Sequence, residues 1–444
     1  MVKIFSPEPS PEFSENEKTI FRFLFIYFLL QALPLSGDLF HTVASVNWLH
    51  ITYGNIFNLS HLSPKFLPGN DTFLNWLIVL LLAVAGSFIW GRSGLKEQNY
   101  PGLYYWLRVI IRYRLAIGVI AYGFIKLFPL QAPFPSISNL NTAYGDITTW
   151  KLFSMSLGIV PGYESFLGAT EILAGLLLFF RKTATFGALI ILVFTGNVFI
   201  SNLAYGGGEY IYGLYLLVFA LFVAYFDAGR IYHLISLGRA TQPNKFNPVF
   251  TQKQGLARLV LKSLVIFFFV ILYGFKTYSG FHHDPYQFPQ KAGLVGISGI
   301  YTVSEFKINH KELPFSATDP VRWKDVVFER WATLSVRSNR PVIIDSVNHE
   351  HIAGNDAGRD YELAGIAGRH YYSYTSDTVH HILFLQNKNS HYTGEKLELH
   401  YVRRDTATII LSGTDQKKDS IYAVLSKINK RYPLTLGRRR LLKL

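Results

Sequence analysis

Long apolar runs fill most of the first 280 residues of this chain. Each run is close to the length that a helix needs to cross the hydrocarbon core of a bilayer, roughly 20 residues. Seven such runs, separated by polar or charged segments, occupy residues 19–35, 73–90, 103–128, 166–180, 184–203, 210–227 and 259–280. The pattern predicts an all-α polytopic membrane bundle of about seven transmembrane helices within residues 18–280.

The segments between the runs differ in character. Residues 1–17 are rich in Pro and Glu, which is typical of a short disordered tail. Residues 38–72 are rich in aromatic residues, His and Asn, and we expect them to lie at the membrane surface. The prolines of residues 129–135 forbid a continuing helix, whereas residues 147–160 are amphipathic enough for a short re-entrant or surface helix.

From residue 281 onward the apolar runs shorten and charges become frequent. Apolar and polar positions alternate in residues 331–338, 369–376, 381–388 and 396–414, as expected of strands. Residues 281–444 are therefore predicted to form a mostly β soluble domain. Within it, we expect a helix near residues 419–429 and a basic tail over residues 437–444.

The basic residues are distributed unevenly around the seven runs. The chain has 43 Lys and Arg against 29 Asp and Glu, and those between the runs concentrate on one side, before residue 23 and at residues 92–96, 181–182 and 230–258. Basic residues gather in cytoplasmic loops. We therefore expect a multi-pass protein of a bacterial inner membrane with a cytoplasmic N-terminus and a periplasmic C-terminal domain, and we expect no nucleic-acid partner.

The amino-acid composition excludes several kinds of cofactor site. The chain has no Cys, which excludes disulfides, thiolate metal sites, iron–sulfur clusters and covalently attached c-type haem. No His lies in the seven runs, so a haem b cytochrome is not expected. His349 and His351 would point the same way on a strand and could chelate a metal, but solvated surface histidines explain so short a motif better. We predict no metal site.

Two helical runs carry polar stripes. Glu164, Gly168, Glu171 and Gly175 recur at spacings of four, three and four, which places them on one helix face. The glycines would let another helix approach closely, so Glu171 is predicted to face the bundle interior. In residues 103–128, Arg114, Gly118, Tyr122 and Lys126 form a comparable stripe, whereas Arg108 and Arg112 are interpreted as anchors that reach lipid headgroups.

The polar groups converge on one depth. With alternating helix directions, Lys126 lies about 3 Å, Glu171 about 7 Å and Asn197 about 9 Å from the outer ends of their helices, and Asn202 lies near the surface. Three interpretations stay open for Glu171. It ties helices together by pairing with Lys126 or Lys276, it handles protons with a lysine, or it holds the headgroup of a lipid-soluble substrate.

Several segments resemble the DoxX-like membrane protein family. They are YGFIKLFPLQAPFPS from Tyr122, the Tyr-Gly-Asp that ends at Asp146, GATEILAGLLLFFRKTATFGALI around Glu171, and GNVF, which contains Asn197. The likeness covers about residues 112–233 and implies a four-helix core in an elaborated form with an extracytoplasmic domain. Some relatives are associated with quinone-linked oxidation, which implies that Lys126, Gln131, Glu171 and Asn197 surround a quinone headgroup.

These observations lead to a leading hypothesis and an alternative. The leading hypothesis is a membrane protein that binds a lipophilic molecule, with a quinone as the candidate; if it is an enzyme, we expect a quinone-linked oxidoreductase. Glu171 and Lys126 are the catalytic candidates, and the substrate-binding candidates are Tyr122, Gln131, Asp146, Asn197 and Asn202. In the alternative, the bundle is a non-enzymatic anchor in membrane lipid and the β domain docks to another envelope protein.

Overall fold

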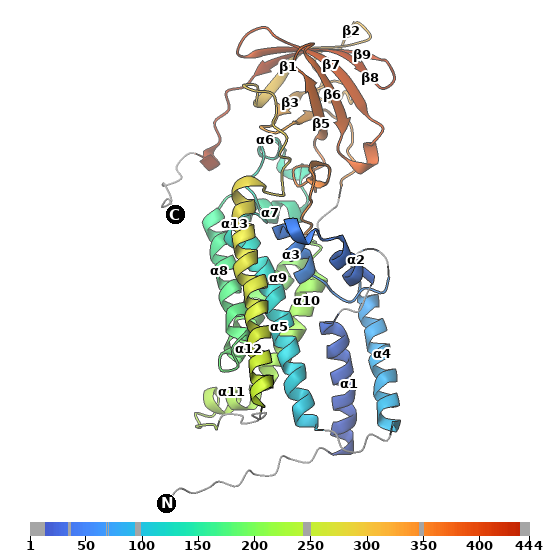
Figure 1. Ribbon diagram of the computed structural model, residues 1–444. Helices are drawn as coiled ribbons and strands as arrows, with labels where there is room; N and C mark the ends of the chain where they lie inside the picture. The colour runs from blue at the N-terminus through green and yellow to red at the C-terminus, as the bar shows by residue number, and fades with distance from the viewer. Residues whose placement is uncertain are drawn as a thin grey trace, which may run out of the picture.

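The computed structural model describes residues 14–33, 37–67, 69, 71–93, 99–242, 250–345 and 350–435. A helical bundle and a β-barrel are stacked end to end (Figure 1). Most of the tail predicted at residues 1–17, the basic tail at 437–444 and His349 lie outside the described residues. Ser14 caps the first helix through a reciprocal capping box with Glu17, so this helix begins two residues before the expected end of the tail.

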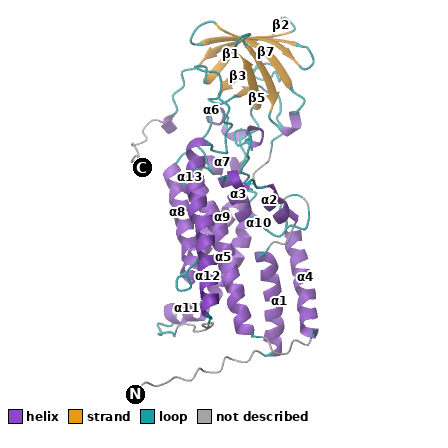
Figure 2. Cartoon of the chain, viewed as in Figure 1, coloured by secondary structure: helices purple, strands orange, loops and turns teal. Residues whose placement is uncertain are grey.

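The helical region follows the predicted runs closely. Figure 2 shows its helices in purple. Its helices are α1 (Glu15–Ala32), α2 (Gly37–Ser45), α3 (Tyr53–Ser60), α4 (Phe73–Arg92), α5 (Tyr100–Leu127), α6 (Ile137–Leu140), α7 (Thr149–Gly158), α8 (Pro161–Leu178), α9 (Ala184–Tyr205), α10 (Tyr210–Tyr225), α11 (Ala228–Ile235), α12 (Gln252–Ile266) and α13 (Tyr273–His283). A wide π-helical segment, Phe267–Leu272, joins α12 to α13. The short helix expected within residues 147–160 is α7.

The predicted count of seven spans is not supported. Three helices of the described chain are long and apolar enough to cross a membrane: α4, α9 and the continuous helix Gln252–His283. A fourth is added if α10 and α11, which meet at a bend of 68°, form one span. The other predicted spans, α1, α5 and α8, carry charged residues, and in α5 and α8 several of these are buried against other helices. Their helicity was predicted correctly. Their charged residues, however, make them less apolar than a helix that crosses a membrane.

Glycines allow α5 and α8 to pack with their backbones close together. A Cβ atom on Gly168 would lie 2.3 Å from the backbone nitrogen of Leu127 and 2.5 Å from the carbonyl oxygen of Gly123. A Cβ atom on Gly175 would lie 2.4 Å from Cγ1 of Ile120. These contacts explain the small-residue stripe in the sequence and fix α8 against α5.

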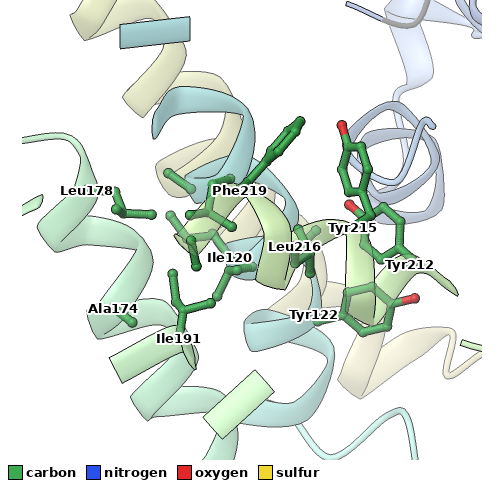
Figure 3. Packing of buried hydrophobic residues seen from close by; sticks show 14 of the residues in the cluster. Ile120, Tyr122, Ala174, Leu178, Ile191, Tyr212, Tyr215, Leu216 and Phe219 are labelled. Carbon is green, nitrogen blue, oxygen red and sulfur yellow. The ribbon is translucent and has the colours of Figure 1, made fainter. Parts of the chain in front are cut away.

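The core of the bundle surrounds this contact. Ile120 of α5, Ala174 and Leu178 of α8, Ile191 of α9 and Phe219 of α10 are almost fully buried in one cluster. Figure 3 shows Tyr122 and Tyr212 side by side at one edge of that cluster. The aromatic hydroxyl groups therefore lie at the border between the apolar core and a more polar zone.

The C-terminal domain is a closed antiparallel barrel of eight strands. Its strands are β1 (Gly299–Ile308), β3 (Asp325–Phe328), β4 (Thr333–Arg337), β5 (His370–Asp377), β6 (Ile382–Asn387), β7 (Lys396–Arg403), β8 (Thr408–Asp415) and β9 (Ser420–Lys427). Pairing of β1 with β9 closes the barrel, and the short β2 (Lys311–Glu312) forms a hairpin with β1. The prediction of a mostly β domain is confirmed.

The prediction of a helix near residues 419–429 is wrong, because strand β9 occupies this segment. Its burial alternates strictly, with Ile421, Ala423 and Leu425 inside the barrel. Ala and Leu favour helices locally, but pairing with β8 and β1 on both sides outweighs that preference.

The loop after α5 fastens the bundle to the barrel. Glu329, which follows β3, is buried and accepts hydrogen bonds from the backbone nitrogen and hydroxyl group of Ser138 in α6, both at 2.7 Å. Burial raises the pKa of Glu329 to about 7. Nearby, the backbone nitrogen of Thr148 donates to the carbonyl oxygen of Gly365 at 2.9 Å. The long connection between β4 and β5 is thereby held against the helices.

Replacing Gly168 by Ala tests the close packing of α5 and α8. The added methyl group meets backbone atoms that cannot rotate away, so we expect Gly168→Ala to cost about 1–3 kcal/mol of stability. Gly162→Ala is the matched control on the same helix, because a Cβ atom there meets nothing within 4 Å. Thermal unfolding in detergent would measure both variants, and equal midpoints would contradict the packing argument.

Candidate functional site

A cavity of about 410 Å³ lies at the end of the bundle that faces the barrel. Its walls come from α5, α7, α8, α9 and α10, and residues that connect the bundle to the barrel also line it. Its charged wall residues are Lys126, Glu164, Glu171, Glu209, Glu350, Arg359 and Asp360. Acidic groups therefore outnumber basic ones around this cavity.

Lys126 and Glu171 form a buried ion pair on the cavity wall. The Nζ atom of Lys126 lies 2.5 Å from Oε1 of Glu171, and both side chains are at most one-tenth exposed. The contact between α5 and α8 positions the pair, since Gly168 stands one helical turn before Glu171 on the same face. The second carboxylate oxygen of Glu171 is buried and has no hydrogen-bond partner among the described residues.

Glu164 repeats this arrangement two turns earlier on α8. Its Oε1 atom accepts a hydrogen bond from the backbone nitrogen of Ala132 at 3.0 Å, whereas its buried Oε2 atom has no partner within the described structure. An unsatisfied buried carboxylate oxygen is costly, by about 1–3 kcal/mol or more for a charged group. Glu164 and Glu171 thus both line the cavity, and each keeps one buried oxygen without a partner in the described structure.

Glu209, immediately before α10, joins three parts of the protein. Its Oε2 atom accepts a hydrogen bond from the Tyr122 hydroxyl group at 2.7 Å and lies 3.1 Å from Nε2 of His61, which follows α3. Its Oε1 atom accepts from the backbone nitrogen of Glu350 at 2.9 Å. This carboxylate thus links α5 and the end of α3 to the β4–β5 connection.

Glu350 brings the β4–β5 connection into the cavity. Its carboxylate accepts hydrogen bonds from the Tyr286 hydroxyl group and from Nε2 of Gln131, the latter at 2.8 Å. Gln287 donates to the carbonyl oxygen of Gln131 at 2.7 Å and so holds the same loop. Burial raises the pKa of Glu350 to about 7 and that of Tyr286 well above its ordinary value.

The helices α8 and α9 both line the cavity. Near their connecting turn they pack closely, since a Cβ atom on Gly187 would lie 2.7 Å from the carbonyl oxygen of Ala174. Leu167 of α8 and Val198 of α9 line the cavity. Asn197 is exposed on α9, although α9 is apolar enough to cross a membrane. The cavity is thus bordered by a helix that has both lipid-compatible length and a polar wall residue.

Six of the seven predicted site residues surround this cavity: Tyr122, Lys126, Gln131, Glu171, Asn197 and Asn202. The amide of Asn202 donates to the carbonyl oxygen of Val198 in its own helix at 2.9 Å.

Asp146 is placed elsewhere, beside Gly368 at the junction with the barrel, where its backbone oxygen accepts from the nitrogen of Ala367 at 2.8 Å. Arg108 and Arg112, interpreted as headgroup anchors, are each only 6% exposed within the protein.

Sequence reasoning missed the contributions of Glu350 and Tyr286 to the site. Glu350 stands 219 residues after Gln131, and no periodic pattern could connect the two. Glu164 was visible in the sequence as part of the stripe that includes Glu171. Among the described residues, no group of three or more His, Asp or Glu is arranged to hold a metal ion.

In comparisons with known proteins, no family model, no curated protein and no solved structure matches this chain. The resemblance to the DoxX-like family therefore stays a prediction.

The raised pKa of Glu350 makes the stability of the folded protein depend on pH. Since its folded value of about 7 lies above the ordinary 4.5, the stabilisation by protonated Glu350 is complete below about pH 4.5 and is lost as the pH rises through about 7. Gln mimics the protonated carboxyl group and does not titrate. We expect Glu350→Gln to gain thermal stability relative to the wild type between pH 5 and pH 8.5, measured by scanning fluorimetry; parallel curves would contradict this.

Proposed function

We propose that the protein binds a lipophilic molecule in this cavity and holds the polar headgroup of that molecule between Glu164, Glu171 and Lys126. The observation that carries the proposal is that Glu164 and Glu171 both line one cavity and that each keeps a buried carboxylate oxygen without a partner in the described structure. An ion pair that only holds two helices together does not need an acceptor oxygen without a partner. A ligand with hydroxyl or amine groups would satisfy both carboxylate oxygens.

The charge of the wall supports a headgroup that donates hydrogen bonds. Of the two basic wall residues, Lys126 is paired with Glu171, and Arg359 lies 2.6 Å from Asp284. An anionic headgroup would meet an excess of carboxylates at close range and be repelled. The hydroxyl groups of a quinol fit this environment, and a quinone is the candidate that the DoxX-like resemblance implies.

The remaining wall supports a ligand with an apolar body. Leu157, Leu167, Val198 and Leu216 line the same cavity as the carboxylates. Ligand sites commonly combine apolar walls with a few placed polar groups and have volumes of about 300–1,000 Å³. Since α9 is apolar enough to cross a membrane and carries exposed Asn197, we propose that the ligand enters from the bilayer beside α9.

The side chains of this chain could also exchange protons with the headgroup. Lys126 donates a hydrogen bond to one oxygen of Glu171, and a headgroup hydroxyl would donate to the second oxygen. Glu350 also lines the cavity and has a pKa of about 7, so it can gain or lose a proton near neutral pH. We propose binding and proton exchange as the roles of these residues, and quinone-linked oxidoreduction as the reaction class that would use them.

The position of the site in the cell follows from the charges near the helix ends. Lys and Arg concentrate in segments at the end of the bundle away from the barrel. By the positive-inside rule that end faces the cytoplasm. We propose an inner-membrane protein with the barrel and the cavity toward the periplasm.

Mass spectrometry of protein purified in native lipid tests the proposal. We expect wild-type protein to retain a quinone or another specific lipid, and Glu164→Gln to lower the retained amount about tenfold by turning a free acceptor into a donor. This variant keeps an oxygen for the bond from Ala132, which protects the fold. Combining Lys126→Met with Glu171→Gln removes the ion pair as a unit and should have the same effect.

Glu305→Gln is the matched control, because Glu305 lies on β1 of the barrel, away from the cavity walls. Wild-type protein that carries no specific small molecule would overturn the binding proposal. The same ligand at equal occupancy in all variants would place the binding site elsewhere. A stoichiometric protein partner retained in all variants without any ligand would instead favour the anchor-and-docking alternative.

A further inference from the structure

A second group of charged side chains lies at the end of the bundle away from the barrel. It consists of Arg108 and Arg112 in the first half of α5, Arg181 in the turn after α8, and Arg258 and Lys262 on α12. Arg112 is 14 residues before Lys126 in α5, so this basic cluster lies about 21 Å from the cavity. The cluster is therefore separate from the proposed ligand site.

Arg112 is buried without a counter-charge among the described residues. Its residue is 6% exposed, and its Nε atom is buried without a hydrogen-bond partner. No ion pair or hydrogen bond joins Arg112 to any other described residue, and Arg181 and Arg258 are close enough to repel it. A buried cation surrounded by cations is strongly unfavourable unless an anion compensates it.

Arg108, one turn earlier, shows what a compensated arginine looks like in the same region. Its guanidinium group lies 3.7 Å from the carboxylate of Asp227 and 3.6 Å from the ring centre of Phe226. Asp227 also pairs with Arg230 and accepts a hydrogen bond from Thr185, both through short contacts. This carboxylate is already shared, so it leaves Arg112 without compensation.

The helix α12 borders the cluster but is not packed into the bundle. None of its residues is buried, whereas α13 buries Tyr273, Gly274, Thr277 and Gly280. Lys262 instead places its Nζ atom 3.8 Å from the ring centre of Phe180, in the turn after α8. Figure 1 shows α12 along the front of the bundle. The basic residues of α12 are thus accessible beside Arg112.

We propose that Arg112, Arg258 and Lys262 bind the phosphate group of an anionic phospholipid. Arg and Lys side chains at the ends of membrane helices are suited to this group, and basic pockets between helices on the cytoplasmic side bind anionic headgroups. The exposed apolar residues Leu259 and Leu264 of α12 would contact the acyl chains, which a soluble phosphate lacks. This site is independent of the proposed function of the cavity.

The test uses the full-length protein in micelles that contain phosphatidylglycerol or phosphatidylcholine. We expect native mass spectrometry to find bound phosphatidylglycerol on the wild type and about tenfold less on Arg112→Gln or on the double variant Arg258→Gln with Lys262→Gln. Arg92→Gln is the matched control, because Arg92 is an exposed arginine at the same end of the bundle. It should retain the lipid like the wild type.

Thermal unfolding separates loss of the site from loss of the fold. In phosphatidylcholine alone, Arg112→Gln should be as stable as the wild type or more stable, since it removes an uncompensated buried charge. Added phosphatidylglycerol should raise the midpoint of the wild type more than that of the variant. Equal retention of phosphatidylglycerol by both proteins, or an equal loss in Arg92→Gln, would overturn the site, and equal stabilisation by inorganic phosphate would overturn the lipid assignment.

Discussion

The bundle depends on the contact between α5 and α8, because that contact determines where two of its charges lie. Gly168 and Gly175 allow the backbones to approach, and the approach places Lys126 2.5 Å from Glu171. Separation of the pair would leave each charge buried alone, at a cost of several kcal/mol. The packing of two helices therefore sets the chemistry of the cavity wall.

Sequence patterns predicted the parts of the site that local periodicity controls. The spacing of Glu171 with its glycines placed it inside the bundle, and helix directions placed Lys126 at the same level. The pattern could not show Glu350, which reaches the cavity only because the β4–β5 connection is held between barrel and bundle. The length of the run also led us to count α5 as a span, although Arg108, Arg112, Arg114 and Lys126 make it more charged than a span should be.

The barrel contributes directly to the cavity. Glu350 comes from the β4–β5 connection, and Tyr286 precedes β1; their side chains meet Gln131 from the loop after α5. Ser138 of the same loop is fixed by Glu329 of the barrel. A domain that only docked to a partner would not need to close a cavity in its anchor. The composite wall therefore supports a site that requires both regions.

Comparison with a buried glutamate that has a structural role shows why the free oxygens matter. Glu362, at the junction with the barrel, is completely buried, yet one oxygen accepts from Thr333 and Lys388 and the other from Trp331. Glu164 and Glu171 each leave one oxygen without a partner in the described structure, and Arg112 at the far end leaves a guanidinium group uncompensated. Glu164 and Glu171 lie near the barrel and Arg112 lies about 21 Å away along α5, so we propose two separate ligands: a hydrogen-bond donor near the barrel and an anion at the other site.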